Sequence, residues 1–344
     1  MQEKKDLIDR IKERYTQYNL SRVESLGALR PSDIRRLCFD VGVSLLIIIF
    51  LEILVSDLAL YPLVYLAGSF AVEESPVIMT TLLNVYSCVA SYLPKLIVFY
   101  ILYRKYRKLN HLLPAYKNSP VYFPIMFFAT FSFGMCGSQI TKVINYVFQL
   151  LFKAGEIPNV MEQNAPIDAE SGLVMLIFSA LVAPICEELI YRKFLLGSMR
   201  AMGETPAILI SSLIFGLAHG NFDQFAYATL SGMVFAILAV RYKSIIPTIL
   251  LHIANNLLVS VVVYRDILLT GNSAIDGVIN AVSIVGNAVT NLSYFAMPFI
   301  MFAVALCGVA KVERVTGENA KQKLTALFNP VLIFGLFVML MQFV

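Results

Sequence analysis

The sequence has few of the features that mark a soluble or disulfide-bonded protein. Only 15% of its 344 residues are charged, and its five cysteines include no CxxC pair. All five lie far apart in apolar stretches, which predicts small buried hydrophobic side chains and no disulfide or zinc framework. Internal repeats and low-complexity tracts are also absent. A cleavable signal peptide is not expected, because the first 36 residues are polar and rich in charge.

Apolar residues are abundant and occur in long runs. They make up 58% of the chain, against about 45–50% in soluble domains. A helix needs about 20 apolar residues to cross a bilayer. The pattern predicts an all-α, polytopic transmembrane helix bundle of about eight or nine spans, at 38–60, 77–103, 122–144, 172–197, 205–222, 224–241, 244–264, 288–310 and 328–344. The loops between them are too short for a soluble catalytic domain, so any chemistry must lie among the helices.

Lysine and arginine alternate from loop to loop. They are frequent in the N-terminal segment and in every second loop, whereas the other loops hold only Lys153 and Arg265. The positive-inside rule then predicts a multi-pass integral membrane protein with a cytoplasmic N-terminus. We expect it in a bacterial cell membrane. Residues 4–26 have apolar residues at helical spacing, which fits an amphipathic helix on the membrane surface or an ordinary solvated helix equally well.

Two carboxylates and a guanidinium lie inside the fourth predicted span. Each ionisable residue in a span costs about 2.5–3.5 kcal/mol on insertion scales, so each needs a reason. Glu188 and Arg192 are four residues apart, which predicts an ion pair on one helix face. Glu187 would point about 100° away from Glu188 and stay available for proton chemistry. A purely structural ion pair is the alternative.

Two of the three histidines lie in apolar helices. His219 ends the segment Phe215-Gly-Leu-Ala-His219, and His252 precedes Asn256 by four residues, which places both on one face. An imidazole and an amide so placed could donate hydrogen bonds to a developing oxyanion, bind a metal or bridge helices. The third, His111, falls in a basic loop, where we expect a solvated side chain.

Depth in the membrane brings these residues together. Counted from the cytoplasmic end of each span, Glu187 lies roughly 15 Å in, His219 roughly 21 Å, His252 roughly 12 Å and Asn256 roughly 18 Å. A shared polar site is therefore predicted over three unrelated structural contacts. Lys95, Asp40, Glu52 and Lys142 each look isolated near or inside a span, and snorkelling or a helix-end position is expected for them.

At these residues the sequence resembles the CPBP family of intramembrane proteases, also called the Abi or type II CAAX prenyl endopeptidase family. The family motifs EExxxR, FxxxH and HxxxN stand here as Glu187 to Arg192, Phe215 to His219 and His252 to Asn256. Each motif alone is weak, but all three in order and in membrane spans are specific. The resemblance covers roughly 172–260. Many bacterial members have Phe-Arg-Gly at the end of the first motif, where this chain has Tyr191-Arg192-Lys193.

The resemblance implies a role for each motif residue. Glu187 and His219 would activate the attacking water, and Glu188 and Arg192 would fix the position and charge of Glu187. His252 and Asn256 would stabilise the oxyanion. A divalent metal such as zinc, held by Glu187, His219 and His252, is one possibility. Because no HExxH is present, a metal-free glutamate–histidine mechanism is equally open.

The expected function is that of an intramembrane endopeptidase that cleaves a membrane-anchored protein or peptide near the cytoplasmic face. Prenylated CAAX-type substrates fall within this class. The alternative is a non-catalytic or protease-like bacteriocin immunity or scaffold protein that uses the same cavity. A transporter is disfavoured because the motif-bearing half has no inverted repeat. The expected partners are the lipid bilayer and the substrate, with no nucleic acid.

These expectations divide the chain into four parts. A cytoplasmic amphipathic segment (1–37) precedes N-terminal transmembrane helices (38–160). The CPBP-like catalytic core (161–264), with a conical cavity, is followed by C-terminal transmembrane helices (265–344).

Overall fold

A computed structural model describes residues 31–69, 76–107, 122–152, 165–166, 168–306 and 327–343. These residues form helices and short connections without strands, so the predicted all-α class is confirmed. The proposed amphipathic helix at 4–26 and His111 lie outside the described residues. The helices are α3 (Pro31–Ser69), α4 (Pro76–Tyr106), α5 (Tyr122–Phe152), α7 (Ala169–Ile177), η3 (Phe178–Val182), α8 (Ala183–Glu187), η4 (Glu188–Leu196), α9 (Gly197–Met199), η5 (Arg200–Met202), α10 (Glu204–Leu217), α11 (Phe222–Tyr242), α12 (Ile246–Leu268), α13 (Ser273–Leu306) and α15 (Pro330–Met341).

Seven of these helical stretches are long and apolar enough to cross a membrane, and one of them is the continuous helix Ala169–Met199 that α7 to α9 form. Two predicted spans, 205–222 and 328–344, are shorter in the structure: α10 has 14 residues and α15 has 12. Helix α10 stops early because Gly220 has a φ of +66° and Asn221 already caps α11. The apolar run that suggested a full span therefore contains a turn.

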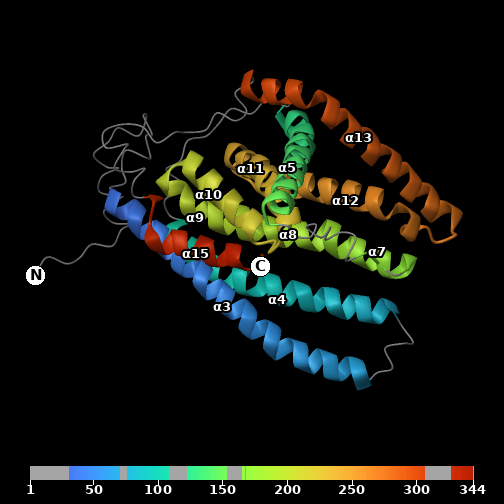
Figure 1. Cartoon of the computed structure of the whole chain (residues 1–344), viewed down its shortest axis with the longest axis horizontal. Helices are drawn as coiled ribbons and strands as arrows, with labels where there is room; N and C mark the ends of the chain where they lie inside the picture. The colour runs from blue at the N-terminus through green and yellow to red at the C-terminus, as the bar shows by residue number, and fades with distance from the viewer. Residues whose placement is uncertain are drawn as a thin grey trace, which may run out of the picture.

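The helices form two groups around the Ala169–Met199 helix (Figure 1). Helices α3 and α4 lie on one side, and α15 packs along α3. On the other side, α13 lies across α5 and α12, while α5 runs steeply to most of the bundle and packs against α11. The chain is a multi-pass integral membrane protein, as these apolar helices indicate.

Glycine lets two helix pairs approach closely. A Cβ on Gly137 of α5 would lie 2.3 Å from the Cα of Tyr227 on α11, and one on Gly42 of α3 would lie 2.6 Å from the backbone of Val331 on α15. Small residues at such crossings are typical of membrane helices, whose association depends on close backbone packing. These contacts fix the outer helices against the core.

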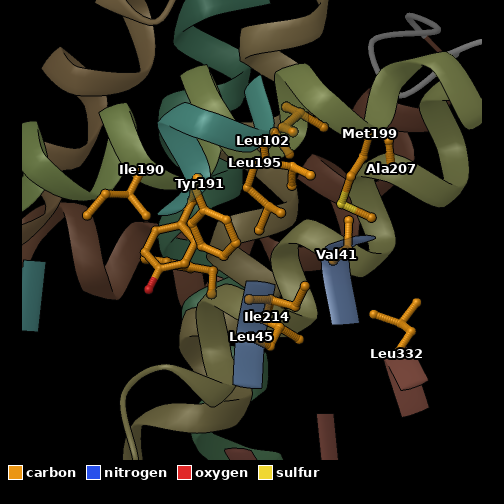
Figure 2. Close-up of a cluster of buried hydrophobic side chains, with 14 of the residues drawn as sticks. Val41, Leu45, Leu102, Ile190, Tyr191, Leu195, Met199, Ala207, Ile214 and Leu332 are labelled. Atoms are coloured by element: carbon orange, nitrogen blue, oxygen red, sulfur yellow. The ribbon is translucent and has the colours of Figure 1, made fainter. Parts of the chain in front are cut away.

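The buried apolar cluster drawn in Figure 2 holds η4 in place. Tyr191 and Leu195 of η4 and Met199 of α9 pack there against Leu45 of α3 and Ile214 of α10, and all five are nearly inaccessible to solvent. Since Glu188 and Arg192 lie on the same short helix, this packing also sets their positions.

The expectation of isolated charges is wrong for three residues. Lys95 of α4 forms an ion pair with Glu52 of α3. Asp40 of α3 accepts hydrogen bonds from Lys105 at 2.6 Å and from Tyr106, both near the end of α4. Charges on neighbouring spans meet at equal depth, and each pair ties α3 to α4.

Candidate active site

The first motif lies on a helix that is wound irregularly by a proline. Pro184 has no N–H, and its ring would clash with a regular helix one turn earlier. The preceding segment η3 is a π-helical turn, in which the N–H of Ala183 donates to the carbonyl of Phe178. The next candidate donor for the carbonyl of Ser179 would be residue 184, which is proline. That carbonyl instead accepts a hydrogen bond from Nδ2 of Asn256 at 2.9 Å.

The helix that carries the motif begins with a capping box. Asp168 caps the first turn of α7, accepting from the backbone N–H of Ser171 at 2.8 Å and from its hydroxyl at 2.6 Å. These two hydrogen bonds hold the pKa of Asp168 below its usual value, and the bond from the Ser171 hydroxyl has the larger effect. The start of the helix is thereby anchored outside the membrane-spanning part.

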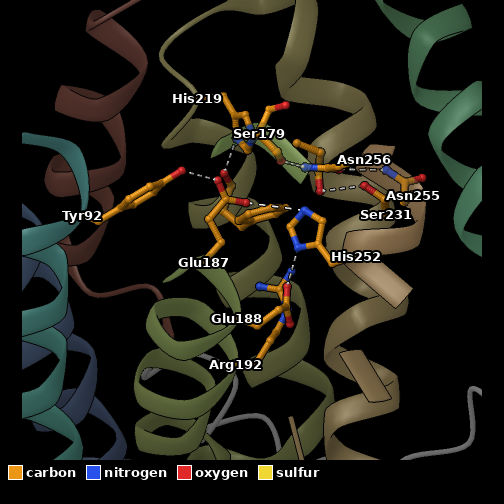
Figure 3. A network of polar contacts seen from close by, with 12 residues as sticks. Tyr92, Ser179, Glu187, Glu188, Arg192, His219, Ser231, His252, Asn255 and Asn256 are labelled. Atoms are coloured by element: carbon orange, nitrogen blue, oxygen red, sulfur yellow. Dashed lines mark hydrogen bonds and ion pairs between the residues drawn. The ribbon is translucent and has the colours of Figure 1, made fainter. Parts of the chain in front are cut away.

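Glu187 is held from two sides. The hydroxyl of Tyr92 on α4 donates to its Oε1 at 2.9 Å, and Nε2 of His252 on α12 lies 3.6 Å from its Oε2. Figure 3 shows this arrangement, with His219 pointing toward the same carboxylate from above. Two helices and one turn therefore converge on Glu187.

Glu188 is fully buried and faces the other side of His252. Its Oε1 lies 3.0 Å from Nδ1 of His252, and its Oε2 lies 3.4 Å from Nε of Arg192. The predicted ion pair between Glu188 and Arg192 is therefore present. Since an ionised carboxylate only accepts, Nδ1 of His252 carries the hydrogen. The imidazole of His252 thus stands between the two adjacent carboxylates, stacked on Phe235 with ring centroids 4.6 Å apart.

Arg192 is enclosed by aromatic rings. Its guanidinium carbon lies 4.6 Å from the ring centroid of Phe215 and 5.6 Å from that of Phe235. Gly232 of α11 makes room, because a Cβ there would lie 2.8 Å from the Phe215 ring and 3.4 Å from Nη2 of Arg192. The guanidinium nitrogens are buried and have no hydrogen-bond partner among the described residues.

His219 lies just beyond the end of α10, in the turn that leads to α11. Its Nδ1 is 2.9 Å from the carbonyl of Phe215, so Nδ1 donates and the neutral ring keeps Nε2 as an acceptor. Asn221 holds the turn by donating to the carbonyl of His219 at 2.7 Å and accepting from the backbone N–H of Gln224 at 2.8 Å. The FxxxH motif therefore sets both the position and the tautomer of the histidine.

Asn256 completes the set one turn after His252. One hydrogen of its amide goes to the carbonyl of Ser179, and its Oδ1 accepts from Nδ2 of Asn255 at 3.2 Å. The amide group has a second N–H. Figure 3 shows Asn256 at the same level as His219, on the α12 side of the site.

A three-ligand metal site is not formed by these side chains. Among the described residues no group of three or more His, Cys, Asp and Glu converges as a metal ion requires. Of the predicted candidates, Glu187 and His252 lie close together, and Nδ1 of both histidines has an oxygen partner, which leaves Nε2 as the ring nitrogen that could bind an ion.

The structure gathers all six predicted site residues, and it adds three that the motifs did not indicate. Tyr92 is one of 17 tyrosines and carries no sequence signal. Asn221 could have been found as a helix N-cap from its position before an apolar periodic run. The carbonyl of Ser179 is exposed by Pro184, and a proline inside a predicted span was a usable signal.

Comparison with known proteins bears on the same segment. Residues 169–258 match the model of the "Type II CAAX prenyl endopeptidase Rce1-like" family. The match covers this core segment alone. The family's region begins with α7 and ends two residues after Asn256, so it holds every motif residue but not Tyr92.

Two relatives agree with this assignment. The "Putative membrane peptidase YdiL" of Bacillus subtilis (strain 168) is 33% identical over 133 residues, which cover 38% of this chain and 50% of YdiL. The "Membrane-embedded CAAX protease MroQ" of Staphylococcus aureus (strain USA300) is 28% identical over 90 residues, which cover 24% of this chain and 36% of MroQ. The chain thus spans half or less of these relatives' own length. No solved structure matches the chain.

Proposed function

We propose that the protein is an intramembrane endopeptidase in which Glu187 and His219 activate water for attack on a peptide bond. The observation that carries the proposal is the convergence of Tyr92, His252 and His219 on the single carboxylate of Glu187. A structural ion pair would not need this, because Glu188 already pairs with Arg192. The family of the core segment and the names of its two relatives support the same chemistry.

The two activating groups are both acceptors. Nε2 of neutral His219 has a lone pair, and Oε2 of Glu187 is not taken by the Tyr92 hydroxyl, which binds Oε1. A water between them would donate one hydrogen to each and aim an oxygen lone pair at the substrate carbonyl. Attack forms the C–O bond as Glu187 takes the water proton.

Collapse of the tetrahedral intermediate completes the reaction. The second amide N–H of Asn256 faces the developing oxyanion, while its first is fixed on Ser179. The C–N bond then breaks, and Glu187 passes its proton to the leaving amine. Glu188 and Arg192 are positioning residues. Glu188, paired with Arg192, orients His252, and His252 flanks Glu187.

This route needs no metal step. Nδ1 of His219 donates to a backbone carbonyl and Nδ1 of His252 to the Glu188 carboxylate, so contacts within the protein hold both rings in position. The proposed substrate is a membrane-anchored protein or peptide, including the CAAX type, that enters a cavity from the cytoplasmic side. Residues 104–105 of α4, 193 of η4 and 243 after α11 are basic, as the positive-inside rule expects of that side.

The test is cleavage by the purified full-length protein in lipid vesicles, against a panel of membrane-anchored peptides with and without a prenyl group. Glu187→Gln and His219→Gln should each slow cleavage by about 10²–10⁴, the usual contribution of a general base. Glu170→Gln, which changes an acid in the first turn of α7, is the matched control and should cleave like wild type.

Equal cleavage by wild type and both site variants would overturn the proposal. The immunity or scaffold alternative predicts that the Glu187→Gln variant remains functional in a protection or binding assay. Under that reading Glu187→Gln would keep full protection against a bacteriocin or full partner binding, because neither requires proton transfer.

A further inference from the structure

A basic cleft opens next to the active site, at the end of the bundle where α11 meets α12. Its volume is about 270 Å³. Arg192 and Arg200 lie in its walls and are nearly inaccessible, whereas Lys193 and Lys243 are exposed at its edge. Four cations and no acidic residue line this part of the described structure. Since Arg192 pairs with Glu188 and Arg200 with Glu204, most of the positive charge of the cleft comes from Lys193 and Lys243.

Arg200 has hydrogen-bonding capacity left over. It donates from one nitrogen to Glu204 at 2.5 Å, but its Nε has no acceptor among the described residues. Arg192 borders the cleft only through its backbone, because its side chain is fully buried between Phe215 and Phe235 and pairs with Glu188. Unmet N–H groups on buried guanidinium side chains are costly, and a bound anion would satisfy them.

The start of α12 adds to the positive potential. This helix has 23 residues and begins at Ile246, after Ile245, whose side chain cannot cap it. Ser244 and Ile245 both line the cleft. The positive end of the helix dipole therefore faces the same space.

We propose that the cleft binds the phosphate of an anionic phospholipid headgroup. Arg200 would hold the phosphate oxygens, and Lys193 and Lys243 would attract the charge at the rim. A lipid is favoured as the source because Ile246 and Leu250 of α12, which follow the cleft residue Ile245, are 64% and 56% exposed. They provide exposed apolar surface for an acyl chain close to the cleft. Basic pockets between helices on the cytoplasmic side are suited to anionic lipids.

Lipid binding can be measured without a peptidase assay, so failure of this proposal can be distinguished from failure of the proposed function. The full-length protein is reconstituted in phosphatidylcholine vesicles with a minor fraction of phosphatidylglycerol, and retained lipid is counted by native mass spectrometry. Wild type should retain phosphatidylglycerol in preference to phosphatidylcholine. The double variant Lys193→Gln/Lys243→Asn should weaken this by roughly 25-fold, about fivefold per lysine. Asparagine is chosen because Lys243 has a φ of 49°, which asparagine tolerates.

The control removes a positive charge from the start of α3 instead. Arg36 is exposed there, outside the cleft, and Arg36→Gln should keep the lipid preference within about twofold. Unchanged retention in the double variant, or an equal loss in Arg36→Gln, would overturn the site. Displacement by inorganic phosphate without any preference for phosphatidylglycerol would overturn the lipid as its occupant.

Discussion

The hydroxyl of Tyr92 donates a hydrogen bond to Oε1 of Glu187 at 2.9 Å, across 95 positions of sequence. Tyr92 lies on α4, outside the segment that matches the family. The N-terminal helices therefore do more than enclose the core, because one of them holds the proposed general base. Of the two oxygens of Glu187, this contact occupies one and leaves the other toward His252 and the substrate.

Tyr92→Phe should lower kcat by about 10- to 100-fold with little change in KM. A hydrogen bond to a charged group is worth about 1.5–3 kcal/mol, and its loss here frees the carboxylate to rotate away from the attacking water. Steady-state kinetics on a cleaved peptide measure the split between the two constants. Tyr100→Phe is the matched control, since this tyrosine is exposed on the same helix and its hydroxyl accepts from Arg104, away from the site, while its ring packs against Phe194. A change in KM alone would show that Tyr92 contacts substrate instead.

Sequence patterns predicted the site better than the packing around it. Glu188 and Arg192 pair as their spacing indicates, because both lie on one short helix whose geometry is local. The Tyr92–Glu187 and Lys95–Glu52 contacts join different helices, and no local pattern encodes which span becomes a neighbour.

The early end of α10 was missed for a related reason. Hydropathy averages over a window, so one turn at His219 to Asn221 is hidden inside an otherwise apolar run. Yet the turn is what presents His219 to Glu187. The position of His219 thus depends on a break between two helices, and an average over a window of residues does not detect such a break.

Arg192→Met should destabilise the protein by about 3 kcal/mol, since it leaves Glu188 buried without its cation. Adding Glu188→Gln should restore part of this loss, giving a coupling of at least about 1 kcal/mol between the two positions. Unfolding by a denaturing detergent, followed by circular dichroism, measures all three variants. Additive effects would mean that the 3.4 Å contact contributes nothing to stability.

Pro184→Ala should lower activity by about tenfold while stability stays the same or rises. The new N–H at position 184 offers the carbonyl of Ser179 a helical partner, and Asn256 then loses the acceptor that orients its amide. Such a trade of activity against stability is common at strained functional sites. Cleavage rate and melting temperature are measured together.

Pro206→Ala is the control for the proline change. Pro206 lies in the first turn of α10, where its missing N–H breaks no helical hydrogen bond. This variant should keep wild-type activity. A Pro184→Ala protein that is fully active would separate the π-helical turn from the function of Asn256.

Chelation should leave cleavage unchanged. Nδ1 of His219 donates to the carbonyl of Phe215, Nδ1 of His252 faces Glu188, and Oε1 of Glu187 accepts from Tyr92. These contacts leave Nε2 of both histidines and Oε2 of Glu187 as possible donors, but among the described residues the three side chains do not form a group spaced for a metal ion. Incubation with phenanthroline or EDTA, with elemental analysis of the same preparation, tests this. Loss of activity that added zinc restores, together with stoichiometric zinc in the purified protein, would replace the metal-free route with one in which Glu187, His219 and His252 rearrange to bind the ion.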